Sequence, residues 1–513
     1  ERLNVEYIIR PTNLASLIFD VRKESNPCSL CSKMRKGALY ESAVKYGCNK
    51  VALGHHKDDL IDTFALSLFY EGRLSTFAPK SSLDRTGITL IRPMLFIEEY
   101  KIESLSIDTW GVDYVYIDDN GNLLPGSYSY RDNRTAISSK QVHEIIPFKE
   151  LYAKTGIQFA QFNSIYQLYD DFNNRKLERN NKTLLMIPDY IAYVLTGNKR
   201  HEITNASTMG LLDSTTMKLS EEFLNKLNIP TGIFAPLINP GELIGYLKED
   251  IVGKKVPVIA TCSHDTADAV LGMPVDDKSI FVSSGTWSLV GAELPTYFNS
   301  EKSYKYNFAN ELGYNNTITF LKNTMGMFAL NEVLKEWKAQ GEPVKASELE
   351  GLINEAPKYE GCINFDDPIF FQPKNMIAKI DKYLEKTNQP KPVFKGQYAD
   401  LIYQSLAIKY TQIKKQLEDT TGNTFDKFVI SGGANQAKIL NQYIANASGI
   451  KVTTGPVEAT VTGNVITQLI ALKEVKDVKE ARLIVTNTIE SKEFLPKDKD
   501  VWKERYTKFA KLL

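Results

Sequence analysis

The sequence predicts an α/β protein built from about three folding units. The chain has 513 residues, of which 43% are hydrophobic, and at ~150 residues per domain this length allows several substantial cores. Helix-like and strand-like patterns of apolar residues alternate along it. No stretch approaches the ~20 apolar residues of a membrane-spanning helix, and the first residues lack a signal-peptide pattern. We therefore expect a soluble, cytoplasmic protein.

Charge and cysteine content exclude several classes of protein. The chain carries 62 Lys and Arg against 62 Asp and Glu. A net charge of zero provides no electrostatic footprint for nucleic acid or an anionic membrane, so neither is expected as a partner. The five cysteines do not form a secreted disulfide framework, because three lie in the first tenth of the chain and Cys262 and Cys362 stand alone. The sequence does not indicate an oligomeric state.

The expected elements fall into three runs. In the first, residues 36–47 predict a helix, 50–53 a short buried strand, and 58–72 a helix with one apolar face. The second run predicts strands at 105–107, 112–117 and 123–124, followed by a mostly helical region at 150–200. Between its last two strands, Asn120-Gly121 is typical of a hairpin turn, because this pair tolerates positive φ at both central positions.

The third run carries the clearest strand–helix alternation. Strands are expected at 258–261, 279–282 and 427–430, and a helix at 437–447. A long helix with one apolar face is predicted by Ile402, Leu406, Tyr410, Ile413 and Leu417.

Asp265 is the candidate catalytic residue. It stands in Cys-Ser-His-Asp-Thr-Ala at 262–267, directly after a predicted strand and at the start of a helix. Removing a proton from a hydroxyl requires a carboxylate held by a rigid element, and this position provides one. The alternative is that Asp265 only caps the helix, and the motif alone favours that cap.

Two glycine turns are candidates for binding phosphate. The first is Ser-Ser-Gly-Thr-Trp-Ser at 283–288, between two predicted strands, and the second is Ser-Gly-Gly-Ala-Asn at 431–435, between a strand and a helix. Small residues let backbone N–H groups approach a phosphate, and the start of a helix favours anions. An ordinary hairpin and an ordinary strand–helix connection are the alternatives, and each is favoured when its motif is taken alone.

The order of the motifs along the chain favours the functional interpretations over these structural alternatives. From about residue 101 to near the end, the sequence resembles the FGGY carbohydrate kinases and, within them, the rhamnulokinase branch. The resemblance rests on Asp-Thr-Trp-Gly-Val-Asp at 108–113, Tyr-Arg-Asp-Asn-Arg-Thr at 130–135, Ile-Pro-Asp-Tyr at 187–190, His-Asp-Thr-Ala at 264–267, Ser-Gly-Thr-Trp-Ser at 284–288, Asn-Glu at 310–311, Lys-Asn-Thr-Met-Gly at 322–326, Ser-Gly-Gly at 431–433 and Gly-Pro-Val-Glu-Ala-Thr at 455–460.

The resemblance implies a two-domain actin-like ATPase fold with the substrates between the domains. It implies transfer of the γ-phosphoryl group of ATP, with Mg²⁺, to the 1-hydroxyl of L-rhamnulose. Asp265 would be the base. The sugar would be contacted by Gly111, His264, Thr266 and Asn310, and ATP would be held by Thr286, Gly432 and Gly433.

The beginning of the chain departs from this family. Such kinases open with an Asp-x-Gly-x-Ser/Thr turn that binds ATP phosphates, and no such turn precedes Asp108. We therefore expect the first strands of the kinase fold to be missing and its turnover to be weak. Residues 1–99 resemble instead PP-loop enzymes of tRNA 2-thiocytidine biosynthesis, through Pro-Cys-Ser-Leu-Cys-Ser at 27–32, Gly-His-His-Lys-Asp-Asp at 54–59, Phe-Tyr-Glu-Gly-Arg-Leu at 69–74 and Ile-Arg-Pro-Met at 91–94.

That second resemblance implies an Fe–S cluster on Cys28 and Cys31. The sequence motifs of this family that form the pyrophosphate loop and supply a third cluster cysteine are not found here. We therefore favour a reduced, vestigial thiol pair at Cys28 and Cys31 over a bound cluster. The expected domains are a partial PP-loop segment (1–99), a truncated sugar-binding domain (100–256), a nucleotide-binding domain (257–490) and a helical tail (491–513). A tRNA-thiolation protein, or a catalytically dead fusion that binds sugar or nucleotide, are the alternative functions.

Overall fold

The computed structural model describes residues 103–512, except 131, 249–254, 286 and 371. Ahead of them it describes 39, 40, 42, 43 and 45 and the backbone of three short strands. The chain divides into two compact units, Asn4–Glu103 and the part that begins at Ser104.

The unit Asn4–Glu103 contains a three-stranded sheet in the order β1–β3–β2. Strand β3 (Ile88–Ile91) pairs in parallel with β1 (Lys50–Ala52) and antiparallel with β2 (Lys80–Leu83). Strand β1 confirms the strand predicted at 50–53, and the described residues from 39 to 45 are helical, as predicted. The cysteine pair at 28 and 31 and the motifs at 54–59 and 69–74 lie outside the described residues.

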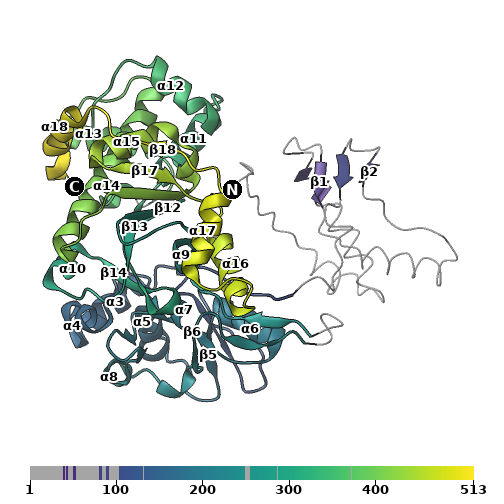
Figure 1. Ribbon diagram of the computed structural model, residues 1–513. Coiled ribbons are helices and arrows are strands. Elements are labelled where there is room, and N and C mark those ends of the chain that lie inside the picture. The colour runs from purple at the N-terminus through teal and green to yellow at the C-terminus, as the bar shows by residue number, and fades with distance from the viewer. Residues whose placement is uncertain are drawn as a thin grey trace. The chain divides into compact units, whose positions relative to one another are not determined.

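The centre of the second unit is a seven-stranded mixed sheet (Figure 1), in the order β14–β15–β13–β12–β16–β17–β18. Only the pairs β12–β16 and β16–β17 are parallel. The strands are β12 (Ser279–Ser284), β13 (Trp287–Leu294), β14 (Ala309–Leu312), β15 (Ile318–Met325), β16 (Lys427–Gly432), β17 (Lys451–Thr454) and β18 (Glu493–Phe494).

Helices cover both faces of this sheet, because successive side chains of a central strand point to opposite sides. Ile280 and Val282 of β12 belong to the core beneath α14 (Lys395–Thr421). Phe281, between them, belongs to a second core with α9 (Asp265–Gly272) and α16 (Ala459–Ala471). The five apolar residues predicted along 402–417 are all fully buried in α14, which confirms that helix.

The other helices of this domain complete both layers. They are α10 (Glu301–Tyr306), α11 (Phe328–Ala339), α12 (Leu349–Glu355), α13 (Met376–Lys386), α15 (Lys438–Ser448), α17 (Val478–Thr488) and α18 (Lys499–Phe509), with the short helices η5 (Tyr314–Asn316), η6 (Ala346–Glu348), η7 (Pro368–Phe370), η8 (Gly433–Gln436) and η9 (Ala510–Leu512). Trp502 and Phe509 of α18 enter the same core as α14.

A smaller domain precedes the seven-stranded sheet in the chain and has its own apolar core. Its strands pair two by two, as β4 (Tyr114–Ile117) with β5 (Thr183–Met186), β6 (His201–Glu202) with β9 (Leu237–Ile238), β7 (Leu212–Asp213) with β8 (Lys218–Leu219), and β10 (Leu243–Tyr246) with β11 (Pro257–Ile259). Its helices are α3 (Thr135–Ile145), α4 (Phe148–Thr155), α5 (Ser164–Tyr169), the π-helical turn η3 (Asp170–Asn174), α6 (Ile187–Thr196), α7 (Ile203–Ser207), α8 (Glu221–Lys226) and η4 (Thr231–Ile233).

Two local predictions in this domain were wrong in detail. The strand expected at 105–107 is reduced to a single parallel bridge between Leu105 and Val258. The hairpin turn forms, but only Gly121 has positive φ, and its amide donates to Asp118 O at 3.0 Å. This is a turn closed by one left-handed glycine, so Asn120 does not use its tolerance for positive φ.

Candidate active site

The Asp265 carboxylate is available for chemistry, because it does not cap the helix that it begins. The residue at the N-cap of α9 is His264, and no side chain caps this end. The Asp265 side chain is 45% exposed, and its carboxylate accepts a hydrogen bond of 3.3 Å from the Thr266 hydroxyl. The helix-cap alternative is therefore wrong for this carboxylate.

Glu202 fixes the backbone immediately before His264. Its carboxylate accepts from the amide and the hydroxyl of Ser263 at 2.9 and 2.8 Å. It also accepts from the amides of Thr204 and Asn205, at 2.9 and 3.1 Å, as the N-cap of α7. Burial raises the pKa of Glu202 to about 7, against the opposing effect of these hydrogen bonds. One buried carboxylate thus joins the smaller domain to the loop that precedes Asp265.

The segment that contains Asp108 runs beside the same loop. Thr109 donates its amide to Ser263 O at 2.9 Å and accepts from the Asp265 amide at 2.9 Å. Asp108 accepts a hydrogen bond of 2.7 Å from the Asn464 side chain of α16. Burial raises the pKa of Asp108, the Asn464 bond lowers it, and the negative charge of Asp265 raises it further. The charge of Asp265 therefore acts on the ionisation of Asp108.

His264 lies between two carboxylates. Its Nε2 is 3.7 Å from Asp265 Oδ1, and its Nδ1 is 3.4 Å from Glu311 Oε2. Glu311 is buried on β14, and this burial raises the pKa of its carboxyl group. Asp265, His264 and Glu311 therefore form a row of three titratable side chains, in which Asp265 is the exposed end and Glu311 the buried end.

The two predicted glycine turns lie side by side, since β12 and β16 are parallel neighbours. Ser283 pairs with Ser431, and Ser284 with Gly432. Gly432 has a φ of 77°, and a Cβ placed on it would lie 2.5 Å from Ser284 O. Gly433 begins η8. Thr286 lies outside the described residues. The glycine at 432 is required by both its conformation and the close approach of the two strands.

The segment from Gly455 to Thr460 makes one hydrogen bond to this glycine turn and one to Asp265. The side chain of Asn435 donates to Gly455 O at 2.5 Å. Five residues later, at the start of α16, the Thr460 hydroxyl donates to Asp265 O at 3.2 Å. The predicted nucleotide turn and the predicted base are thus connected through one short segment.

Two of the predicted sugar contacts make close contacts within the protein. Gly111 is buried against Thr208, and a Cβ on it would lie 2.7 Å from Thr208 Oγ1. Asn310 uses its whole amide internally, since Oδ1 accepts from Phe298 N at 2.7 Å and Nδ2 donates to Gly156 O at 3.1 Å. Because neighbouring residues of a strand face opposite sides, the structure brings Glu311, and not Asn310, to His264.

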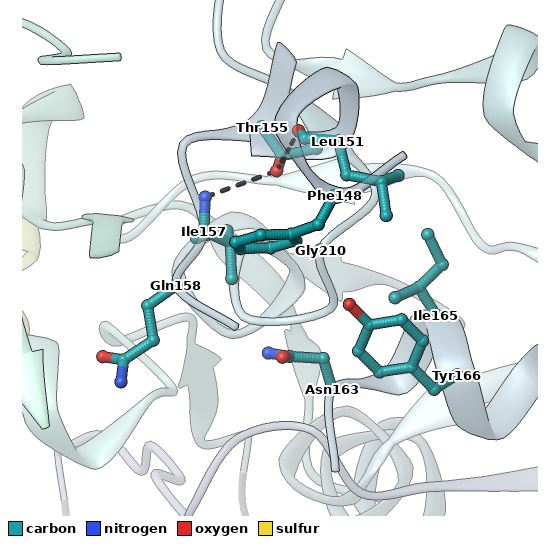
Figure 2. A pocket seen from close by; sticks show the side chains of 9 residues that line it. All are labelled: Phe148, Leu151, Thr155, Ile157, Gln158, Asn163, Ile165, Tyr166 and Gly210. Atoms are coloured by element: carbon teal, nitrogen blue, oxygen red, sulfur yellow. Dashed lines mark hydrogen bonds between the residues drawn. The ribbon is translucent and has the colours of Figure 1, made fainter. Parts of the chain in front are cut away.

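A small pocket in the smaller domain is separate from this constellation (Figure 2). Phe148, Leu151, Ile165 and Tyr166 provide most of its apolar lining, with Thr155 hydrogen-bonded to Leu151 O at 2.8 Å. None of the predicted site residues lines it. The adjoining Gly156 O is the acceptor for Asn310, so the pocket wall supports β14.

The sequence contained the residues that surround Asp265 but gave no sign of their roles. Asp108 and Glu311 both stand inside the motifs quoted for the family, whereas Glu202 belongs to none of them. Glu202 stands immediately before α7 as its N-cap, but glutamate is not among the residues that favour this position, so the local sequence did not indicate the cap.

Comparison with known proteins identifies the family. Residues 87–272 match the model of the FGGY family of carbohydrate kinases, N-terminal domain, and residues 280–472 match that of the C-terminal domain. The chain belongs to the FGGY family of carbohydrate kinases. The first match begins ahead of the expected boundary at 99, and the domain boundaries stay a prediction.

Curated relatives of this FGGY kinase carry the name rhamnulokinase. That of Bacillus subtilis is 42% identical over 411 residues, covering 78% of this chain and 83% of the relative. That of Lactiplantibacillus plantarum is 34% identical over 486 residues, covering 91% and 97%. Among solved structures, the ligand-bound xylulose kinase of Lactobacillus acidophilus has a TM-score of 0.65 at 15% identity, covering 80% of this chain and 84% of that one. The glycerol kinase of Plasmodium falciparum with ADP has a TM-score of 0.63 at 15% identity, covering 82% and 84%.

These matches confirm the predicted fold class and the predicted type of activity. The kinase part has the two-domain, actin-like ATPase fold, and the chain is an ATP-dependent sugar kinase, a phosphotransferase. Neither the family matches nor these relatives point to tRNA thiolation. Of the helices in the described part of the chain, none has the length and apolar character needed to span a membrane.

Proposed function

We propose that this kinase transfers the γ-phosphoryl group of ATP to the 1-hydroxyl of L-rhamnulose, giving L-rhamnulose 1-phosphate and ADP. The identity of the sugar is supported by relatives named rhamnulokinase at 34–42% identity. The observation that carries the mechanism is the exposed carboxylate of Asp265 at the first position of α9. This carboxylate does not cap the helix, so it is available to a substrate.

In the proposed reaction, Asp265 accepts the proton of the sugar hydroxyl as its oxygen forms a bond to the γ-phosphorus. The bond from that phosphorus to the bridging oxygen of ADP breaks, and ADP leaves with the electron pair. Such a transfer depends mainly on positioning and on neutralising charge. Gly111, His264 and Thr266 are the proposed sugar contacts, and Asn310 remains the weakest of the four because its amide is already satisfied.

The paired ends of β12 and β16 fit a nucleotide phosphate. Gly432 excludes any side chain there, and the buried hydroxyl of Ser431 has no hydrogen-bond partner. We propose that Thr286, Gly432 and Gly433 hold ATP.

Within the described residues, no group of three or more His, Cys, Asp or Glu side chains could hold a metal ion. Mg²⁺ commonly binds through phosphate oxygens and water, so we propose that it enters with ATP and neutralises phosphate charge. A reaction that draws on ATP is expected in the cytoplasm.

The test is a coupled assay of ADP release with L-rhamnulose, D-xylulose and glycerol as acceptors. We expect turnover with L-rhamnulose, and its loss in Asp265→Asn. The control is Asp277→Asn, an exposed carboxylate on the turn before β12, which should leave turnover unchanged. A preference for another acceptor would overturn the sugar assignment, and an active Asp265→Asn would overturn the base.

The same protein tests the catalytically dead alternative. Calorimetry that detects L-rhamnulose binding without any ADP release would support a binding protein in place of an enzyme.

A further inference from the structure

We propose that His264 and Glu311 form a proton-holding pair behind Asp265, in which His264 takes the proton that Asp265 removes from the sugar and Glu311 stabilises the resulting imidazolium. This inference rests on the proposed role of Asp265 as the base. It assigns Glu311, for which the sequence suggested no role, as a positioning residue that acts through His264.

The geometry of the pair is the first observation. Glu311 Oε2 and His264 Nδ1 lie 3.4 Å apart. Both atoms are buried, and neither has a hydrogen-bond partner within the usual limits. Leaving a buried polar group unsatisfied is costly, so two such atoms facing each other form a site where a modest contraction creates a strong, charge-assisted hydrogen bond.

The position of the other ring nitrogen is the second observation. His264 Nε2 is 3.7 Å from Asp265 Oδ1, slightly beyond hydrogen-bond distance. If Glu311 accepts the proton on Nδ1, Nε2 presents a lone pair to Asp265. An ionised Asp265 has no proton to share with that lone pair, which accounts for the gap. Catalytic hydrogen bonds are often long in the free enzyme and shorten during the reaction.

The charges around His264 favour this direction of transfer. Its ion-pair partners in the described structure are Asp265 on α9 and Glu311 on β14. Asp108 faces Asp265 from the neighbouring segment, and Glu202 holds the preceding residue, so the surrounding titratable groups are acidic. Burial raises the pKa of Glu311, the charge of His264 lowers it, and that of Asp265 raises it. The side chains that face the His264 ring from α9 and β14 are therefore both acidic.

The proton path is chemically balanced. The sugar O–H bond breaks as the oxygen bonds to phosphorus, and the proton moves to an oxygen of Asp265. It then moves to Nε2 of His264, which becomes an imidazolium with Glu311 as its counter-ion. In water an imidazole, with a pKa of about 6.5, binds a proton more tightly than an aspartate, with a pKa of about 3.9. The second transfer therefore frees Asp265, and His264 then releases the proton to water, which accounts for the one proton that the net reaction liberates.

A kinetic experiment tests the pair in the full chain. In Glu311→Gln we expect kcat to fall by ~10²-fold, within the range of acid–base contributions, with the KM for L-rhamnulose within about threefold of wild type. Glu311→Asp should recover part of kcat. In a His264→Asn background, Glu311→Gln should cause no further loss. A rise in KM at constant kcat would overturn the proposal in favour of a sugar contact.

The matched control removes a different half-buried ion pair. Glu293 on β13 contacts Arg482 at 2.7 Å, and Glu293→Gln removes the same charge from the same domain. It should lower thermal stability without changing kcat. An equal fall of kcat in both variants would show that Glu311 acts only through the fold, and would also overturn the proposal.

A second measurement does not depend on turnover. The chain contains five histidines, so the ring nitrogens of His264 are identifiable by ¹⁵N NMR through comparison with His264→Asn. We expect the resting proton on Nδ1 in wild type and its redistribution in Glu311→Gln. A resting proton on Nε2 would overturn the relay, whether or not Asp265 is the base. An active Asp265→Asn with the expected tautomer would instead overturn only the proposed function.

Discussion

Glu202 accepts two hydrogen bonds from Ser263 on one oxygen, at 2.9 Å from the amide and 2.8 Å from the hydroxyl. These residues are 61 positions apart and belong to different parts of the kinase fold. Since His264 and Asp265 follow Ser263 directly, the placement of the proposed base depends on a carboxylate that never contacts substrate.

The burial of Glu202 predicts a pH-dependent stability. The pKa rises from 4.5 to about 7 in the folded chain, so the native state binds this proton more tightly than the unfolded state. The stabilisation is complete below pH 4.5 and is lost as pH rises through 7, amounting to about 3 kcal/mol. We expect Tm to fall between pH 5 and 8 in wild type and to change less in Glu202→Gln.

Thermal unfolding across this pH range measures the effect. The control is Glu221→Gln, an exposed glutamate at the start of α8, which should keep the wild-type slope. If Glu202→Gln keeps it as well, the carboxyl group titrates near its ordinary range and the prediction is wrong.

Gly432→Ala should weaken ATP binding. The added Cβ meets Ser284 O at 2.5 Å in a backbone conformation with positive φ, so the two strand ends must separate. We expect the KM for ATP to rise at least tenfold while the KM for the sugar changes little. Gly422→Ala is the matched control, because Gly422 also has positive φ but no atom within 4 Å of the added Cβ. It should cost about 1 kcal/mol of stability without changing either KM.

Local patterns predicted the elements well, since they depend on residues close in the chain. The apolar face of α14 and the strands before both glycine turns follow from periodicity, and the structure contains them. The pairing of Ser284 with Gly432, 148 positions apart, follows from the strand order of the whole sheet. No local pattern contains that order.

The same limit explains the difference between Asn310 and Glu311. The motif Asn-Glu marked this place on the chain, but neighbouring residues on a strand point to opposite faces. Which of the two faces the site depends on how β14 docks, and this is set by the bonds from Asn310 to Gly156 and Phe298. A sequence motif identifies the strand and leaves its orientation open.

Asn310→Ala distinguishes the sequence-based role of this residue from the structural one. Removal of its bonds to Phe298 and Gly156 should cost about 1–3 kcal/mol, since the Phe298 amide loses its acceptor while Gly156 O keeps the bond from the Asn310 amide, with an unchanged sugar KM at a temperature where the variant is folded. Tyr152→Phe, which removes a single bond of 2.8 Å to Phe308 O nearby, should cost about 1 kcal/mol. A large rise in sugar KM for Asn310→Ala would restore the direct contact.

Asn464 should matter through the ionisation of Asp108. Its side chain donates to Asp108 at 2.7 Å and accepts from Gln468 at 2.8 Å, on the same face of α16. In Asn464→Ala, the half-buried Asp108 carboxylate loses its donor and the Ser106 hydroxyl loses its acceptor, and we expect a loss of about 2–3 kcal/mol at pH 7.

This loss should shrink as pH falls. The pKa of Asp108 is already raised by burial, and removal of the donor raises it further, so protonation at lower pH neutralises the unsatisfied charge. Denaturant unfolding at pH 5 and 7 measures the difference. Gln468→Ala breaks bonds to two neutral groups, the Ser104 hydroxyl and the Asn464 side chain, and should cost about 1–2 kcal/mol at both pH values. Equal, pH-independent losses in the two variants would mean that the charge of Asp108 contributes nothing, and that α16 is held to this segment by packing alone.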